Sequence, residues 1–259
     1  MQQPSELKEL LDELYDRYDR EEFIAPDPIS IPHMFSARED IEISGFLAAT
    51  IAWGNRKAIV KSARRMTEYM DSAPYDFTMN ASQAELDGLR SFVHRTFNGD
   101  DFRTFVLALR RFYAEKGGLG GWFEADYALR GDIRCVLSDF RREFFDLPHS
   151  AHSEKHLSSI DRKAACKRLN MYLRWMVRPD ARGVDFGLWR DIPASALYLP
   201  LDVHSGEVGR SLGLLERRQN DWKAVEEITE RLRLMDPTDP AKYDYALFGA
   251  GIYCAAEVE

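Results

Sequence analysis

The amino-acid sequence predicts an all-α protein built as one domain of two helical lobes. Apolar side chains recur every three or four residues along most of the 259-residue chain, which is the period of an amphipathic helix. The alternation of apolar and polar residues that marks a half-buried strand is almost absent. A hydrophobic content of 45% supplies enough apolar surface for one large core or two closely packed lobes.

Two segments interrupt the helical pattern of the sequence. Prolines at 26, 28 and 32 interrupt regular structure after the first helix, and the polar run from His149 to Ser153 precedes the second half. No repeat or polar linker divides the chain. We therefore expect a first lobe of about residues 30–150, and a second lobe of about residues 1–30 and 151–259 that carries the candidate catalytic segment.

Three helices are expected in the first seventy residues. The first is amphipathic, with leucines and tyrosines on one side between residues 7 and 18. The second covers residues 41–53, is apolar on most sides and belongs in the core, and Ser36 with Glu39 has the form of a capping box before it. Asn55 is expected to cap the third helix, which is basic and turns Ile59 and Ala63 inward.

Seven further helices are expected, over residues 82–97, 101–116, 132–145, 162–177, 203–212, 222–234 and 241–255. The glycine-rich run at residues 117–121 lacks the lysine and hydroxyl ending of a phosphate-binding loop, and it follows a helix where such loops follow a strand. We expect this run to be a flexible connection between helices.

The composition argues against several classes of protein. Because the chain has no leader pattern and no apolar run of membrane-spanning length, we expect a cytoplasmic protein without a membrane partner. Cys135, Cys166 and Cys254 are too far apart for a disulfide framework or a four-thiolate metal cluster, and we expect buried thiols. A formal net charge of -8 argues against indiscriminate binding of nucleic acid.

Two basic segments stand out against this acidic average. Residues 56–65 contain five basic side chains and no acid, and residues 162–182 contain seven basic side chains and only Asp180. Both are either solvated helix faces or surfaces for nucleic acid. Lys163, Lys167, Arg174 and Arg178 have the spacing of one helix side, so we expect a cationic edge that is exposed while the opposite side packs.

One segment resembles a known enzyme family. Residues 199–214 read LPLDVHSGEVGRSLGL, which is similar to the catalytic segment of the HhH-GPD superfamily of base-excision DNA glycosylases. Pro200, Asp202, His204 and Arg210 match positions of that pattern. Lys167, 35 residues earlier, stands where bifunctional members carry their nucleophilic lysine, with Lys163 as the alternative. The whole resembles an uncharacterised bacterial family in this superfamily, with likeness to archaeal 8-oxoguanine glycosylases.

The resemblance implies a fold of the helix-hairpin-helix glycosylase type and double-stranded DNA with a damaged base as the partner. In such chemistry Asp202 would stabilise positive charge at the sugar, and the Lys167 amine would attack the same carbon, form a Schiff base and permit strand cleavage. Asn55 takes the position of the side chain that fills the gap left by an extruded base. The other residues expected to contact DNA or line the base pocket are Lys57, Lys61, Lys163, Arg168, Arg174, Trp175 and His204.

Alternatives remain beside this hypothesis. Residues 159–162 read SIDR where the family hairpin has two glycines that let backbone N–H groups approach a phosphate. A non-catalytic relative that binds nucleic acid or a nucleoside-like ligand is therefore the second hypothesis, and a helical interaction scaffold is the third. Asp202 also suits an ordinary helix N-cap. A metal site at Asp202 and His204 has little support from the spacing of other ligands, so we expect neither a metal nor a cofactor.

Overall fold

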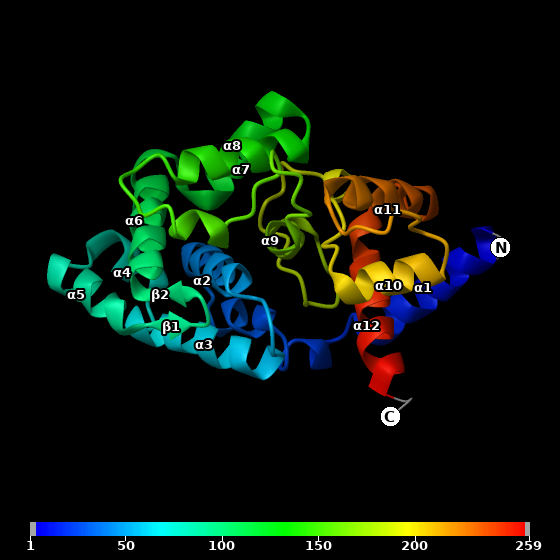
Figure 1. Cartoon of the computed structure of the whole chain (residues 1–259), viewed down its shortest axis with the longest axis horizontal. Coiled ribbons are helices and arrows are strands. Elements are labelled where there is room, and N and C mark those ends of the chain that lie inside the picture. Colours follow the sequence, from blue (N-terminus) through cyan, green and yellow to red (C-terminus); the bar gives the residue numbers. More distant parts are fainter. Residues whose placement is uncertain (1–3, 257–259) are drawn as a thin grey trace. The chain divides into compact units, whose positions relative to one another are not determined.

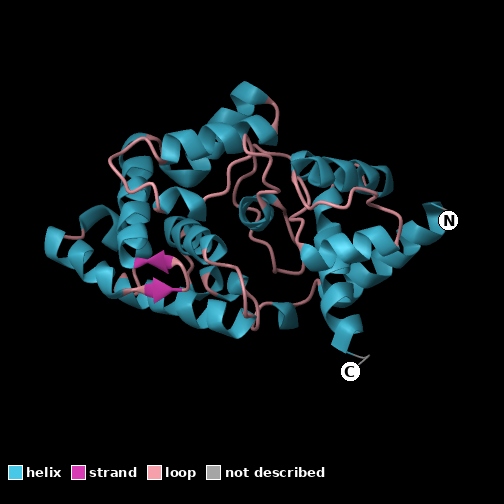
Figure 2. Ribbon diagram, in the orientation of Figure 1, coloured by secondary structure: helices cyan, strands magenta, loops and turns pink. Residues whose placement is uncertain are grey.

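The computed structural model describes the backbone of residues 4–256 and the side chains of residues 5–251. Helices dominate this part of the chain, and its strands form a single short hairpin, so the all-α prediction is confirmed (Figure 2). Two compact units are present: a terminal unit of Met1–Phe23 with Ser159–Glu259, and a middle unit of Ile24–Ser158. The sequence places its lobe boundaries at about residues 30 and 150. None of the helices within residues 4–256 has the length and apolar content needed to cross a membrane.

The middle unit contains seven α-helices between short turns and the hairpin (Figure 1). Its elements are η2 (Pro28–Ser30), η3 (Pro32–Met34), α2 (Arg38–Thr50), α3 (Arg56–Tyr69), α4 (Pro74–Asn80), α5 (Gln83–Gly88), η4 (Leu89–Ser91), β1 (Val93–His94), β2 (Phe97–Asn98), α6 (Gly99–Glu115), α7 (Gly118–Arg130), α8 (Ile133–Phe144) and η5 (Ser153–His156).

Helix α2 lies in the core of the middle unit, as its apolar sequence predicts. The ring of Phe46 contacts Phe105 of α6 and both Phe140 and Phe144 of α8, and each of these four rings is almost fully buried. Aromatic pairs with offset or edge-on geometry add to the free energy gained from burying their area. This aromatic cluster fixes α6, whose first turn carries the buried carboxylate of Asp101.

The terminal unit combines the first helix with the last hundred residues. Its elements are α1 (Pro4–Tyr18), η1 (Glu21–Phe23), α9 (Lys167–Val177), η6 (Ala194–Ala196), α10 (Val203–Ser211), α11 (Trp222–Met235), η7 (Pro240–Lys242) and α12 (Tyr243–Ala256). Helix α12 packs against both α1 and α10, which Figure 1 shows around it. The apolar sequence of α12 suits this central place.

Several predicted boundaries in the middle unit are wrong. The helix expected over residues 82–97 ends at Gly88 and is followed by η4 and the hairpin, which buries Phe92 and Phe97. The glycine-rich run begins α7, because two glycines with positive φ end α6 and the buried Leu119 anchors the next helix. The N-cap of α2 is Ala37, without the predicted capping box at residues 36 and 39.

The cysteine prediction is confirmed for one residue and wrong for another. Cys166 is buried, but Cys135 is exposed because the apolar side of α8 is formed by Ile133, Val136 and Leu137. Cys254 lies outside the residues whose side chains are described.

The expected cationic edge of α9 is wrong in two respects. The helix begins at Lys167 and not at residue 162, so Lys163 lies in a preceding turn in which its N–H donates to the Ile160 carbonyl. Arg174 and Arg178 are buried, each only 2% exposed. Spacing along a helix shows which side chains share a side, but it does not show what covers that side.

Acidic side chains from distant segments neutralise the two buried arginines. Arg178 Nε lies 2.7 Å from Asp239 Oδ2, and its Nη1 lies 3.0 Å from Asp185 Oδ2 and 3.5 Å from Asp19 Oδ2. Arg174 pairs with Asp244 of α12 and lies 3.4 Å from Asp185. A buried charge persists only when it is paired and hydrogen-bonded, so these contacts hold α9 to α12 and to the segments at both ends of the unit.

We expect Arg178→Ala to lower the free energy of unfolding by about 3–5 kcal/mol, because it leaves buried carboxylates without their partner. The matched control is Arg17→Ala, since Arg17 pairs with Glu13 on the exposed side of α1 and its side chain is 57% exposed. That change should cost less than about 1 kcal/mol. Equal losses in urea denaturation would contradict the assigned role of Arg178.

Candidate functional site

Two helix N-termini in the terminal unit bring a lysine and an aspartate together. Lys167 is the first residue of α9, and Asp202 is the residue that caps α10. The Nζ atom of Lys167 lies 3.9 Å from Oδ2 of Asp202. The two side chains are 25% and 22% exposed, so both are partly sheltered and still open to solvent. The lysine and the aspartate singled out in the sequence are therefore neighbours.

The two carboxylate oxygens of Asp202 have different partners. Oδ1 accepts the backbone N–H of Ser205 at 2.9 Å and also lies 3.1 Å from its hydroxyl, while the N–H of Asp202 donates to that hydroxyl in return. This reciprocal capping box fixes the side-chain orientation of Asp202. Oδ2 faces Lys167. Asp202 is thus both the ordinary N-cap considered from the sequence and a carboxylate presented to an amine.

A second contact holds the backbone of Asp202. The side-chain amide of Asn220 donates to the Asp202 carbonyl at 2.9 Å, and its oxygen accepts from the guanidinium of Arg210. Arg210 also donates to the carbonyls of Arg217 and Arg218. Arg210, which matches the sequence pattern around Asp202, therefore acts on Asp202 through Asn220.

The surroundings of the Lys167 amine are partly apolar. Its Nζ lies 3.3 Å from the sulfur of Met171 and 5.9 Å from the ring centre of Phe248 on α12. A thioether is a weak hydrogen-bond acceptor, so this side of the amine receives little of the solvation that water would give. The carboxylate of Asp202 lies within ion-pair distance of this amine.

The buried carboxylate of Asp244 interacts electrostatically with Lys167 and Asp202. Burial raises the pKa of Asp244 to about 6, while the positive charges of Arg174 and Lys167 oppose that rise and Asp202 adds to it. Asp244 is therefore electrostatically coupled to both members of the pair. It also pairs with Arg174, which connects the site to the buried network of α9.

The other predicted residues of the terminal unit have different environments. Lys163 and His204 are exposed, and Arg168 is partly exposed. Trp175 is fully buried and Arg174 nearly so, and neither side chain is presented to a base or a phosphate in this structure. Large aromatics dominate helical cores, and this role accounts for Trp175.

In the middle unit, the turn between α2 and α3 presents Asn55. Its side-chain oxygen accepts the N–H of Ala58 at 3.1 Å, so the predicted N-cap is confirmed. Lys57 and Lys61 are exposed on the first turns of α3. The basic segment at residues 56–65 is therefore a largely solvated helix face.

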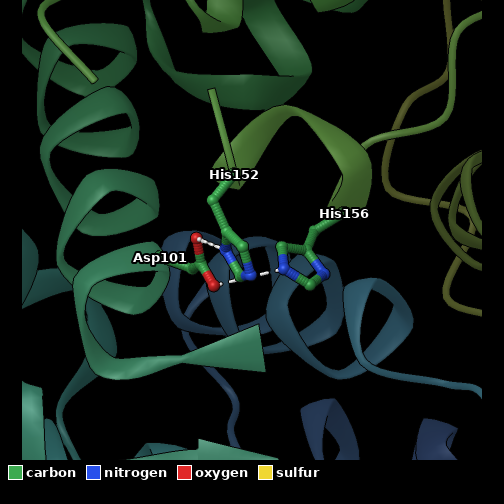
Figure 3. A group of neighbouring side chains, drawn as sticks. All are labelled: Asp101, His152 and His156. Atoms are coloured by element: carbon green, nitrogen blue, oxygen red, sulfur yellow. Dashed lines mark hydrogen bonds and ion pairs between the residues drawn. The ribbon is translucent and has the colours of Figure 1, made fainter. Parts of the chain in front are cut away.

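A group of possible metal ligands also lies in the middle unit, and the sequence prediction omits it. One donor atom each from Asp101, His152 and His156 lies within 4.8 Å of the others. Figure 3 shows both imidazoles turned toward the carboxylate of Asp101. The signal for this group is the four-residue separation of the two histidines, whereas Asp101 comes from 51 residues before His152 and carries no local signal.

Two substitutions of Asp202 separate its capping role from its charge. Because asparagine caps helices as well as aspartate does, Asp202→Asn should change the free energy of unfolding by less than about 0.5 kcal/mol. Asp202→Ala should lower it by about 1 kcal/mol, since the N–H of Ser205 loses its acceptor. Thermal or urea unfolding measures both, and a larger loss for the asparagine variant than for the alanine variant would contradict the capping geometry.

Comparison with known proteins gives one match. A family model described as Protein of unknown function (DUF2400) matches residues 27–253. No curated protein and no solved structure matches the chain. Since the family model spans most of the chain, the protein belongs to the DUF2400 family.

Proposed function

We propose that the protein is a DNA repair glycosylase with AP lyase activity, with a fold of the helix-hairpin-helix glycosylase type and double-stranded DNA containing a damaged base as its substrate. The observation that carries this proposal is the 3.9 Å separation between Lys167 Nζ and Asp202 Oδ2. These residues are 35 positions apart and belong to different helices, yet they meet at the positions that the resemblance to glycosylases assigns to the nucleophile and the acid.

The pair has the chemistry that base excision requires. Breaking the bond between the base and C1′ develops positive charge on the sugar, and a fixed carboxylate stabilises that charge. Asp202 has one oxygen fixed by the cap of α10 and the other directed to the lysine. The Lys167 amine attacks C1′ as the C1′–N bond breaks, and the departing base takes the bonding electron pair and the proton that the amine loses. Breaking the bond between C1′ and the ring oxygen, which takes up a proton, gives a Schiff base from which the 3′ phosphate is eliminated.

The segment before α9 supports this proposal despite its lack of glycines. Lys163 has φ of 64° and Cys166 has φ of 49°, which are left-handed conformations that glycine adopts most readily. The backbone thus makes two left-handed bends before Lys167 without a glycine at either position. The helix that follows has no side-chain cap from Cys166, and a helix N-terminus is a place where a phosphate is favourably bound.

Borohydride reduction tests the covalent step. Wild-type protein incubated with a duplex that contains an abasic site should form a reduced protein–DNA adduct, because borohydride converts a Schiff base into a stable amine. Lys167→Ala should abolish the adduct. Lys163→Ala is the matched control, since Lys163 is exposed in the turn before the same helix and should be dispensable for trapping.

Adduct formation that survives in Lys167→Ala but is lost in Lys163→Ala would contradict the assignment of the nucleophile. No adduct from the wild type, together with tight binding of the same duplex, would instead establish the non-catalytic relative considered from the sequence.

Excision tests the role of the Asp202 charge. In single-turnover assays on a panel of lesion-bearing duplexes, Asp202→Asn should lower the excision rate of the preferred lesion by about 100- to 1,000-fold, since it retains the cap and removes the stabilising charge. Asn220→Ala removes the support of the Asp202 carbonyl and an acceptor of Arg210 but leaves the Asp202 charge, so it should have a smaller effect. A folded Asp202→Asn variant with the wild-type rate would contradict this mechanism.

A further inference from the structure

We propose that Asp101, His152 and His156 of the middle unit bind a divalent transition-metal ion. Asp101 lies in the first turn of α6, and the two histidines lie at the start and end of the turn that contains η5. This inference is independent of the proposed glycosylase activity, because it rests on other residues and on another unit of the chain.

The donor atoms have separations close to those around one ion. His152 Nδ1 lies 2.9 Å from Asp101 Oδ1, and His156 Nε2 lies 3.1 Å from Asp101 Oδ2. With metal–ligand distances of about 2.0–2.2 Å, neighbouring donors of one ion are roughly 3–3.5 Å apart. The full set of donor atoms lies within 4.8 Å, so binding of one ion requires the partly exposed His152 ring to move toward it.

The buried histidine supplies an independent observation. The side chain of His156 is 3% exposed, and its Nε2 atom has no hydrogen bond, because the 3.1 Å contact with Asp101 lacks hydrogen-bond angles. A buried polar atom without a well-oriented hydrogen bond is costly. The lone pair of a neutral imidazole nitrogen is the usual donor to a transition metal, so an ion at this position satisfies Nε2.

Two of the three ligands, His156 and Asp101, are held in place before any ion binds. The ring of His156 stacks on Trp53 and meets the edge of Phe97. The hydroxyl of Ser153 donates to Asp101 Oδ1 at 2.7 Å, and the N–H of Asn98 donates to Oδ2 at 3.0 Å. Contacts of this kind orient metal ligands and raise affinity.

The approach to the site is on the side of His152, whose side chain is 38% exposed. Three protein ligands leave at least one coordination position of a bound ion for water, as in sites that hold a reactive metal. Two imidazoles with one carboxylate favour Zn²⁺, Fe²⁺ or Co²⁺ over Mg²⁺ and Ca²⁺, which prefer oxygen ligands.

Lys155 contacts one of the ligands in the metal-free protein and so disfavours metal binding. Its ammonium contacts Nε2 of His152, so Nε2 accepts and the proton of the neutral ring lies on Nδ1, toward Asp101. Metal binding at Nδ1 moves the proton to Nε2 and displaces Lys155, whose side chain is exposed and free to turn into solvent. Removal of this lysine should therefore increase affinity.

Titration of the chelator-treated full chain with Co²⁺ and Zn²⁺ tests the proposal. We expect one equivalent to bind, with a visible Co²⁺ spectrum of nitrogen and oxygen ligands and a rise in the melting temperature. His152→Ala and His156→Ala should weaken binding by more than about 100-fold, since loss of a surrounding contact alone costs about 10- to 100-fold, as expected for Ser153→Ala. Lys155→Gln should tighten binding.

The control is His33→Ala, because His33 belongs to the same unit and lies outside the group. His152→Ala decides the outcome if His156→Ala fails to fold, since His152 is partly exposed. The proposal is overturned if the wild type binds no stoichiometric ion, or if His152→Ala binds as tightly as His33→Ala. A thiolate charge-transfer band would also overturn it by assigning the ion to a cysteine.

Discussion

The terminal unit depends on the neutralisation of two arginine charges buried on α9. Burial disfavours the charged form of Arg178, but Asp185 and Asp239 more than compensate and raise its pKa above the ordinary value. The acids belong to different parts of the unit, so Arg178 holds the residue after α1, the loop after α9 and the segment before η7, while Arg174 holds the first turn of α12. Lys167 lies at the other end of the same helix.

The candidate site combines this rigid helix with a capped one. Asp202 is oriented by hydrogen bonds to its own helix and by Asn220, while Lys167 is carried by α9. Neither side chain is fully buried, and neither is fully solvated. This intermediate environment suits a reacting pair, because a fully buried pair is closed to substrate and a fully exposed one is screened by water. Asp244 extends the same electrostatic cluster into the core.

The sequence predicts the helical class and the meeting of Lys167 with Asp202 for different reasons. The helical class follows from apolar periodicity, which is a local property of the sequence. The proximity of Lys167 to Asp202 follows from the resemblance to glycosylases, because a family pattern relates residues that are far apart in the chain. The burial of Arg174 has no local signal, because its partner Asp244 lies 70 residues away. The same limit applies to Asp101, although His152 and His156 are visible as a four-residue pair. The sequence does not predict α7, because the glycines at its start are typical of a loop.

The proposed activity depends most directly on a covalent bond between the Lys167 amine and DNA. Peptide mapping by mass spectrometry of the borohydride-reduced complex with an abasic duplex measures this most directly. We expect a modified peptide whose fragment ions place the sugar remnant on Lys167. A remnant on another lysine or on the terminal amine, or recovery of unmodified protein alone, would contradict it.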